Sequence, residues 1–391
     1  MRPLSSAYLD NAATSFPKPM SVLREVNTCL SSYCGNPGRG SHALAMASAE
    51  IIYECRERLS ELLGLHAPEN IVFTLNTTYA LNLFIKGFLH EGDPVLISDL
   101  EHNSVLRPID ALARAGVIEY DVFPSLCLDE RRSPTRICAG IAKRLRPNTR
   151  LLLCTHASNV CSYRLPLAEI GAFCHKNGIV FAVDAAQSAG HLPIDMAGMS
   201  IDVLCAPAHK GLYGTQGCGF LALSPSLSLE TDIEGGNGVH SLESIMPTEP
   251  PERYEAGTLP TPSIAALCRG VEYINAIGLD SIAEHEKMLY NHLLALLTET
   301  KGFTVYAPEH SGAVLLFNLD GVPSEVVAGA LGKRGICVRG GFHCSALGHK
   351  TLGTPEGGAI RASFGIFNCP RAVELLYAAL RQLKSELAPT I

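Results

Sequence analysis

The chain has 391 residues, and its 31 lysines and arginines against 38 aspartates and glutamates give a formal net charge of −7 at pH 7, which leaves no basic patch for nucleic acid. No apolar run approaches the roughly 20 residues needed to span a bilayer, and the segment MRPLSSAYLDNAATSF lacks the apolar core of a signal peptide. The 14 cysteines are dispersed without Cys-x-x-Cys pairs, which predicts reduced thiols in a cytoplasmic protein rather than a disulfide framework or a zinc ribbon.

Short apolar strands alternate with helical segments through much of the chain. The strands are PVLIS, RLLLCTH, IVFAVD and DVLCA, and residues 105–116 and 167–178 have helical periodicity. This alternation is typical of parallel βαβ units and predicts an α/β fold. From about Thr261 the pattern changes to helical segments at 263–278 and 281–300, then strands and a last helix at 372–387. We therefore expect a large domain over 15–262 and a small domain formed by 1–14 and 263–391.

A phosphate site is predicted where the strand 71–75 runs into Asn76, Thr77 and Thr78 and then into a helical apolar pattern. Free backbone N–H groups and the positive end of the helix dipole favour an anion there, with two hydroxyls to assist. The alternative is that Thr77 caps the helix, and both roles can hold at once. The spacing matches neither GxxxxGK[ST] nor GxGxxG, which argues against a nucleotide. Such a site uses hydrogen-bond donors and no metal.

Two more polar side chains follow strands at the same edge of the predicted sheet. His102 comes after PVLIS, where its imidazole could stack on an aromatic cofactor, although a capped loop histidine is the commoner role. Asn159 comes after LLLCTH, where its amide could bond a ring oxygen. With the strand ends at Asp184 and Lys210, five strand ends are expected to converge on one ligand.

Asp184 and Lys210 carry the clearest chemistry. The strand in VFAVDAAQSAG runs into Asp184, whose carboxylate can keep a pyridine nitrogen protonated, although a helix N-cap is the alternative. Lys210 ends the run DVLCAPAHK, and a desolvated lysine near cations has a lowered pKa and can hold an aldehyde cofactor as a Schiff base. Pyridoxal phosphate is the usual aldehyde. A lone lysine is mostly exposed, but the strand-Asp, strand-Lys order favours a cofactor site.

Cys344, in VRGGFHCSALGH, is the candidate for a second nucleophile. It follows Arg339, two glycines and His343, a setting expected to be flexible and electropositive, which suits a thiolate. The alternative is an ordinary buried cysteine in a chain that has 14 of them. His343 could serve as a proton donor or thiolate partner, or could be a loop histidine.

At this point the ordered motifs carry a resemblance. The sequence LDNAATSFPKP, NTTYALN, EHNSVLRP, HASNV, VDAAQSAG, HKGLYG, YEAGT, a late HC and IRASFG resembles the class V aminotransferase family of fold-type I pyridoxal phosphate enzymes. Within that family the chain is most similar to the Suf-type cysteine desulfurases and selenocysteine lyases. The resemblance extends from Tyr8 to about Asn368. It implies a large domain with a mostly parallel seven-stranded sheet between helices and a smaller α+β domain.

The resemblance also implies roles for individual residues. Lys210 would carry the cofactor, Asp184 would pair with the ring nitrogen, and His102 would stack on the ring. The ring oxygen would contact Asn159 and Gln187, and the phosphate would contact Thr77, Thr78 and His209. Thr258 would reach the phosphate of a neighbouring subunit, which implies a homodimer with shared sites. Arg361 would clamp the substrate carboxylate with Asn159 and Arg339 nearby, since a planar fork suits a bidentate contact.

The implied reaction converts L-cysteine to L-alanine and leaves the sulfur on Cys344 as a persulfide for an acceptor protein. The chain departs from the Suf-type pattern at Pro207, where many members have a phosphate-binding serine, and at Asn76 and Tyr79 in the NTTYA turn. The segment after Cys344 also differs. The alternatives are a selenocysteine lyase, a transaminase or an epimerase on the same scaffold, or a non-catalytic relative.

Overall fold

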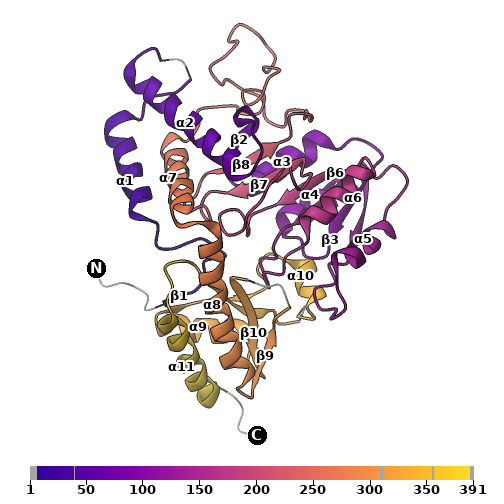
Figure 1. Cartoon of the computed structure of the whole chain (residues 1–391), viewed down its shortest axis with the longest axis vertical. Helices are drawn as coiled ribbons and strands as arrows, with labels where there is room; N and C mark the ends of the chain where they lie inside the picture. Colours follow the sequence, from indigo (N-terminus) through magenta and orange to yellow (C-terminus); the bar gives the residue numbers. More distant parts are fainter. Residues whose placement is uncertain (1–6, 39, 309–311, 355, 388–391) are drawn as a thin grey trace.

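The computed structural model describes residues 7–38, 40–308, 312–354 and 356–387. Its larger part is built on a seven-stranded sheet in which β8 alone runs antiparallel to its neighbours (Figure 1). The predicted α/β fold with a mostly parallel seven-stranded sheet is confirmed. In sheet order the strands are β2 (Ile71–Thr74), β8 (Gly219–Leu223), β7 (Val203–Pro207), β6 (Val180–Asp184), β5 (Leu151–Thr155), β3 (Asp93–Ser98) and β4 (Ile118–Phe123).

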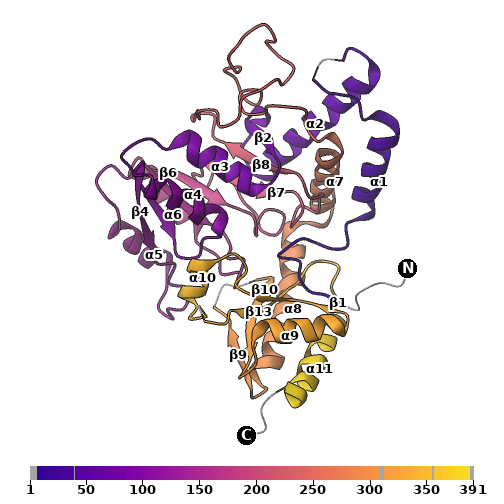
Figure 2. The ribbon, with the colours of Figure 1, turned by 180° about the vertical axis from the view of Figure 1, so that it is seen from behind.

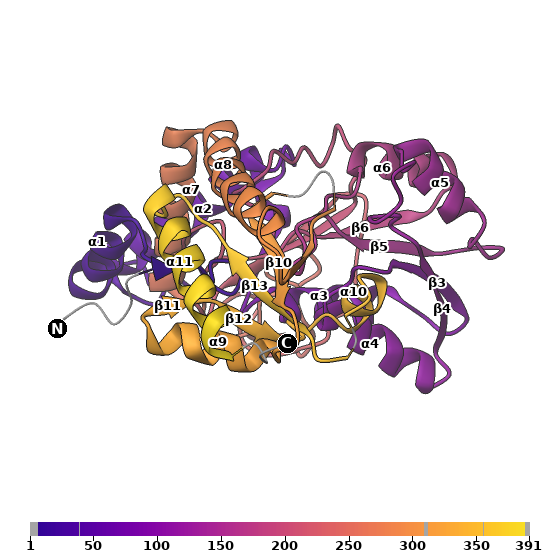
Figure 3. The same cartoon turned by 90° about the horizontal axis from the view of Figure 1, so that it is seen from below.

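Helices cover both faces of this sheet, as Figure 3 shows for α5 and α6 on one side and α3 and α4 on the other. In β5, Leu151 and Leu153 pack with α3 and α4, whereas Leu152 and Cys154 pack with the opposite helices. Burial on both faces explains why the strands are continuous apolar runs in the sequence. One face carries α3 (Thr77–Phe88) and α4 (Asn103–Arg114), and the other carries α2 (Ala43–Leu62), α5 (Pro134–Ala142), α6 (Leu167–Lys176) and α7 (Thr261–Ile277).

A smaller body lies below this sheet in Figure 1 and has an antiparallel sheet in the order β12, β13, β10, β9. Its core joins that sheet to α8, α9 and α11, and the beginning of the described chain adds β1, which pairs in parallel with β11. The first and the last described elements, β1 and α11, both belong to this body (Figure 2). The elements are β1 (Ala7–Tyr8), α8 (Leu279–Thr298), β9 (Phe303–Tyr306), β10 (Val314–Leu319), α9 (Ser324–Lys333), β11 (Ile336–Cys337), β12 (Arg339–Gly341), α10 (Ala346–Thr351), β13 (Ala359–Ser363) and α11 (Pro370–Leu387).

The division into domains at residue 262 stays a prediction. The side chains of α7 pack into the core of the large sheet, against α2 and α1 (Met20–Thr28). This packing favours a boundary after α7 rather than before it. A π-helical turn (Cys29–Tyr33) follows α1, and a short 3-10 turn (Pro68–Asn70) precedes β2. Of the ranges assigned to the small domain, residues 1–6, 309–311, 355 and 388–391 lie outside the described residues.

The strands of the large sheet bring their carboxyl ends to one edge. β3, β5, β6 and β7 run in parallel, so the loops that follow them open on the same side. Ligands of open α/β sheets bind at this edge. Within the described ranges, none of the helices combines the length and the apolar character that a membrane crossing requires.

Candidate active site

A cavity of about 290 Å³ opens at the carboxyl ends of these parallel strands and at the start of α3. The structure brings most of the predicted cofactor residues to its wall, although they are spread over more than a hundred positions of the chain. The lining residues are Asn76, Thr77, Thr78, His102, Ser104, Thr155, Asn159, Asp184, Ala186, Gln187, Pro207, His209 and Lys210. Arg361, Arg339, His343, Cys344 and Thr258 lie outside this wall.

Lys210 is held in a tight loop after β7. Ala208 and Gly214 close the loop through a backbone hydrogen bond of 2.8 Å, and Tyr213 N donates to Lys210 O at 3.0 Å. Burial of the amine lowers the pKa of Lys210 to about 8, and the positive charges of Arg361 and Arg339 act in the same direction, against Asp184. A pKa near neutrality gives this lysine a substantial fraction of the free amine, which is the form that attacks an aldehyde.

Asp184 ends β6 and is buried, with its Oδ1 accepting a hydrogen bond of 2.9 Å from Ala186 N. Residues 185–200, all of them described, form turns and no helix, so the N-cap alternative for Asp184 is wrong. Burial raises the pKa of Asp184, while the contact with Ala186 N and the Lys210 charge lower it. A positively charged group beside this buried carboxylate would therefore form an ion pair with little competition from water.

The start of α3 offers donors that nothing in the described protein uses. Asn76 is the N-cap, and its side chain accepts from Tyr79 N at 3.1 Å. The alternative in which Thr77 caps the helix is wrong, because Thr77 Oγ1 is buried and has no hydrogen-bond partner among the described residues. His209 Nδ1 is likewise buried without a described partner. An anion at this helix N-terminus would satisfy both atoms.

Two differences from the predicted phosphate site are visible. Pro207 lines the cavity as the last residue of β7 and contributes no donor. Ser104, which the sequence analysis missed, also lines the cavity, and its Oγ lies 3.0 Å from Thr78 Oγ1. Its signal in the sequence was its position two residues after His102 at the start of a helix.

His102 is the N-cap of α4, and its Nδ1 accepts from Ser104 N at 3.0 Å. Capping and a place in the cavity wall are therefore compatible for this residue. Burial lowers the pKa of His102 to about 4, with the charges of Lys210 and Arg361 acting in the same direction. The ring is neutral at physiological pH, which suits stacking on an aromatic ring.

The amides of Asn159 and Gln187 lie on the cavity wall and are tied to neighbouring segments. Asn159 Nδ2 donates to His343 O at 2.7 Å, and Gln187 Nε2 donates to Ala12 O at 3.0 Å. Each amide nitrogen has a second hydrogen that remains available to a ligand. Asn159 thereby joins the cavity to the segment that carries Cys344.

Arg361 lies in β13 and is buried, and it contacts the site through Asn159 O, which accepts from its Nη1 at 3.0 Å. Its Nη2 donates to Asp10 Oδ1 at 2.9 Å, and Asp10 Oδ2 accepts from Arg339 Nη2 at 2.9 Å. Asp10 thus bridges the two predicted substrate arginines, and the sequence analysis did not single it out. The motif LDNAAT was recognised, but nothing in it shows which arginine its aspartate meets. Arg361 Nε is buried without a described partner, which leaves one donor for an incoming carboxylate.

Cys344 is exposed, in agreement with the prediction of an accessible thiol. The segment is less free than its two glycines suggest, because Gly340 and Gly341 belong to β12. Asn103 N donates to Cys344 O at 2.8 Å, and Ser345 Oγ donates to Glu101 O at 3.3 Å. The loop that carries His102 therefore holds the Cys344 segment through direct hydrogen bonds.

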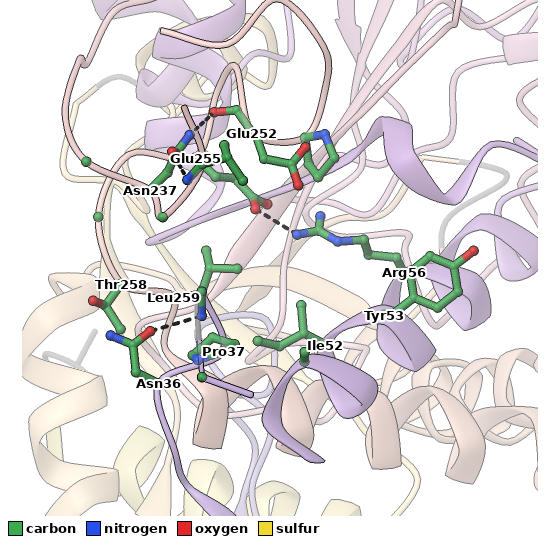
Figure 4. Close-up of a pocket in the computed structure, with 18 of the residues that line it drawn as sticks. Asn36, Pro37, Ile52, Tyr53, Arg56, Asn237, Glu252, Glu255, Thr258 and Leu259 are labelled. Carbon is green, nitrogen blue, oxygen red and sulfur yellow. Dashed lines mark hydrogen bonds and ion pairs between the residues drawn. The ribbon is translucent and has the colours of Figure 1, made fainter. Parts of the chain in front are cut away.

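Thr258 lines a separate cavity of about 660 Å³ instead of the Lys210 cavity (Figure 4). Arg56 and Glu255 point toward one another on its wall and form a buried ion pair of 2.7 Å, while Glu255 Oε1 also accepts from Phe73 N at 2.6 Å. A role for Thr258 in its own Lys210 cavity is not supported by this placement. A role in a neighbouring subunit stays a prediction.

The Arg56–Glu255 pair gives a testable expectation for stability. Arg56→Met is expected to lower the free energy of unfolding by about 3–5 kcal/mol, because Glu255 would stay buried without its cation. Arg58 is a matched control, since it pairs with Glu54 at 2.7 Å on the same helix but is about one third exposed. Arg58→Met should cost less than about 1 kcal/mol. Urea denaturation of both variants measures the difference, and equal losses would contradict the expectation.

The residues present fit pyridoxal phosphate. The cavity has an amine with a lowered pKa, a buried carboxylate, a neutral imidazole and a helix N-terminus with two buried polar atoms that lack described partners. The amine matches the aldehyde of the cofactor, and the carboxylate matches its protonated ring nitrogen. The imidazole matches the aromatic ring, and the helix N-terminus matches the phosphate. The arrangement can therefore bind this cofactor with its ring against His102 and its phosphate at α3.

Comparisons with known proteins agree with this chemistry. The family model described as aminotransferase class-V matches residues 7–376. A probable cysteine desulfurase of Methanothermobacter thermautotrophicus is 33% identical over 96% of this chain and 94% of the relative. A cysteine desulfurase of Escherichia coli is 32% identical over 97% of this chain and 94% of the relative. The apo structure of a cysteine desulfurase from Thermococcus onnurineus superposes with a TM-score of 0.88 at 29% identity, covering 97% of this chain and 95% of that one.

The match to the family model extends over nearly the whole chain, and the cavity has the side chains that the family's cofactor needs. The chain therefore belongs to the class V aminotransferase family, whose members depend on pyridoxal phosphate.

Proposed function

We propose that the protein is a pyridoxal phosphate-dependent cysteine desulfurase, which converts L-cysteine to L-alanine and takes the sulfur onto Cys344. The similarity to proteins named cysteine desulfurase supports this activity. The observation that carries it is an exposed Cys344 in a segment attached to two loops of the cofactor cavity: Asn103 N donates to Cys344 O, and Asn159 Nδ2 donates to His343 O. A transaminase needs only the lysine and an amino donor, whereas a desulfurase needs this second nucleophile.

Bound pyridoxal phosphate would supply an electron sink for the substrate α-carbon. In the proposal, Lys210 holds the cofactor, and its amine then moves the proton at the α-carbon of the substrate. Asp184 keeps the ring nitrogen protonated, and His102 supports the ring face. Thr77, Thr78 and His209 bind the phosphate, and Asn159 and Gln187 contact the ring oxygen.

The substrate contacts follow from the arginines and the thiol. Arg361 binds the substrate carboxylate through its free Nε, with Asp10 and Asn159 O fixing the plane of the guanidinium. The Cys344 thiolate attacks the substrate sulfur, so the carbon–sulfur bond breaks as a sulfur–sulfur bond forms. The β-carbon keeps the electron pair of the broken bond and takes up a proton to become the methyl group of alanine, and Cys344 becomes a persulfide.

His343 is assigned no proton transfer in this scheme. Its Nε2 lies 3.3 Å from Arg339 O and its Nδ1 lies 3.0 Å from His349 Nε2, so both ring nitrogens already have partners. Burial lowers the pKa of His343 to about 3, with Arg361 acting in the same direction. A neutral imidazole with both nitrogens engaged is a poor acid and a poor base for the neighbouring thiol.

The proposal extends to assembly and partners. Thr258 would reach the phosphate of a neighbouring subunit in a homodimer, which agrees with its place in a cavity away from its own Lys210. The persulfide would pass to an acceptor protein in the cytoplasm. The substrate is L-cysteine, with L-selenocysteine as the alternative.

Incubation of the purified holoenzyme with L-cysteine tests the function. Alanine should form, and the Cys344 peptide should gain the mass of one sulfur atom. Cys34 and Cys369 are also exposed and serve as internal references that should stay unmodified. Alanine without added sulfur on the Cys344 peptide would refute the transfer step. Formation of 3-mercaptopyruvate, the 2-oxo acid of cysteine, instead of alanine would favour a transaminase.

A further inference from the structure

Cys344 occupies a strained turn. His343 and Cys344 have φ angles of 52° and 54°, and Ser345 N donates to Phe342 O at 3.0 Å, which closes a turn of type I′. This turn needs positive φ at both central positions and is normally made by Asn, Asp or Gly. Histidine and cysteine adopt the left-handed region only when the surroundings over-determine it. His343 and Cys344 therefore need contacts with residues outside the turn to keep these positive φ angles.

Part of that support comes from outside the turn. Asn159 Nδ2 donates to His343 O at 2.7 Å, and Asn103 N donates to Cys344 O at 2.8 Å. Both central carbonyls are thus fixed by loops of the cofactor cavity. These bonds hold the backbone but leave the His343 side chain to be fixed by other groups.

A hydrogen-bonded chain of side chains fixes that imidazole. His343 Nε2 lies 3.3 Å from Arg339 O, His343 Nδ1 lies 3.0 Å from His349 Nε2, and the two rings are inclined by 14°. His349 Nδ1 lies 2.7 Å from Thr354 Oγ1. All three side chains are buried, with exposed fractions of 8%, 1% and 3%.

The donor and acceptor in each of these side-chain hydrogen bonds follow from the contact with Arg339 O at one end of the series. A carbonyl oxygen only accepts, so His343 Nε2 carries the hydrogen, and Nδ1 of the neutral ring must accept. His349 Nε2 therefore donates and its Nδ1 accepts from the Thr354 hydroxyl at 2.7 Å, a shorter contact than the 3.4 Å from that hydroxyl to His349 O. Burial lowers the pKa of both histidines, which agrees with two neutral rings.

We infer that His349 and Thr354 are positioning residues that hold the strained turn and so keep the Cys344 thiol beside the active site. Thr354 sets the tautomer of His349, and His349 then locks the His343 ring, whose backbone shares the left-handed turn with Cys344. The hydrogen bonds from Asn159 Nδ2 to His343 O and from Asn103 N to Cys344 O place the thiol beside loops of the cofactor cavity while the turn keeps this form. The importance of the thiol itself rests on the proposed function.

Two matched substitutions test the inference in the full-length holoenzyme. Thr354→Val removes the donor at nearly constant shape, whereas Thr354→Ser keeps the hydroxyl. His349→Leu removes the donor to His343, whereas the amide of His349→Gln can replace it. Alkylation by iodoacetamide is followed at neutral pH by peptide mass spectrometry, with the exposed Cys369 in the same molecule as reference.

Thr354→Val and His349→Leu should change the alkylation rate of Cys344 relative to Cys369 by about threefold or more, because the strained turn would no longer hold the thiol in one position. Thr354→Ser and His349→Gln should stay within about twofold of the unsubstituted protein. Single-turnover formation of alanine should slow in parallel, with an unchanged cofactor spectrum. If His349→Leu does not fold, the Thr354 pair alone decides.

An unchanged ratio in Thr354→Val would overturn the inference. This outcome is separable from failure of the proposed function, because alkylation does not require turnover. If Cys344→Ser keeps full sulfur release while the alkylation ratios change as expected, the positioning role stands and the desulfurase proposal falls.

Discussion

Replacing Lys210 with alanine is expected to lower alanine formation from cysteine by about 10²- to 10⁴-fold, the range of a lost general base or nucleophile. The reason is the single amine in the cavity wall, whose pKa burial lowers to about 8. Borohydride treatment of the unsubstituted protein should fix the cofactor to the Lys210 peptide, and no peptide of the variant should carry it. Absorbance and peptide mass measure the attachment, and alanine assays measure the rate.

Lys86→Ala is the control for this prediction. Lys86 lies on α3 and forms a long ion pair of 3.8 Å with Asp232 at the surface. Its removal should leave both the label and the rate unchanged, since exposed pairs contribute little. Fixation of the cofactor to a lysine other than Lys210 would refute the assignment.

Replacing Cys344 with serine is expected to abolish persulfide formation and to lower sulfide release in the presence of a reducing thiol by about 10²-fold or more. Serine is close in size, and the side chain is exposed, so the fold should be unaffected. The spectral response of the cofactor to cysteine should persist, because Lys210, Asp184 and Arg361 remain. Stopped-flow absorbance separates this early response from sulfur release.

Cys369→Ser controls for the loss of an exposed thiol elsewhere in the chain. It should leave sulfide release unchanged. Undiminished release in Cys344→Ser would favour an enzyme in which this cysteine is incidental to breaking the bond from carbon to sulfur or selenium, such as a selenocysteine lyase.

The sequence predicts well which residues line the Lys210 cavity, because each of them lies at the end of a strand or follows closely after it. Asp184 ends β6, and Lys210 follows β7 by three residues, so the order of strands along the chain places both at one edge. The helical segments were also predicted to within a few residues, as for 263–278 against α7 at Thr261–Ile277. Regular periodicity and strand direction are local properties, and local properties can be read from one sequence.

The substrate half was less predictable, because its contacts join distant segments. Asp10 meets Arg361 across 351 positions, and pairing of the segment around Asp10 with Ser363 brings the two together. His349 was overlooked although it stands close to His343, because the contact depends on the turn at Cys344 and on the short helix α10. The two glycines before Cys344 predicted mobility, whereas in the structure they belong to a strand.

The fixation of the Cys344 turn has a consequence for how sulfur would depart. Asn103 and Asn159 hold the carbonyl groups of Cys344 and His343. The thiol is therefore not carried on a mobile loop that could move toward an acceptor protein. In the proposed reaction, Cys344 therefore gives up the persulfide sulfur at the same position where it receives the sulfur from the substrate. A recipient must therefore insert its own nucleophile beside Phe342, which is 49% exposed. The shape of the surface around Cys344, rather than a movement of the Cys344 segment, would determine which acceptor can take the sulfur.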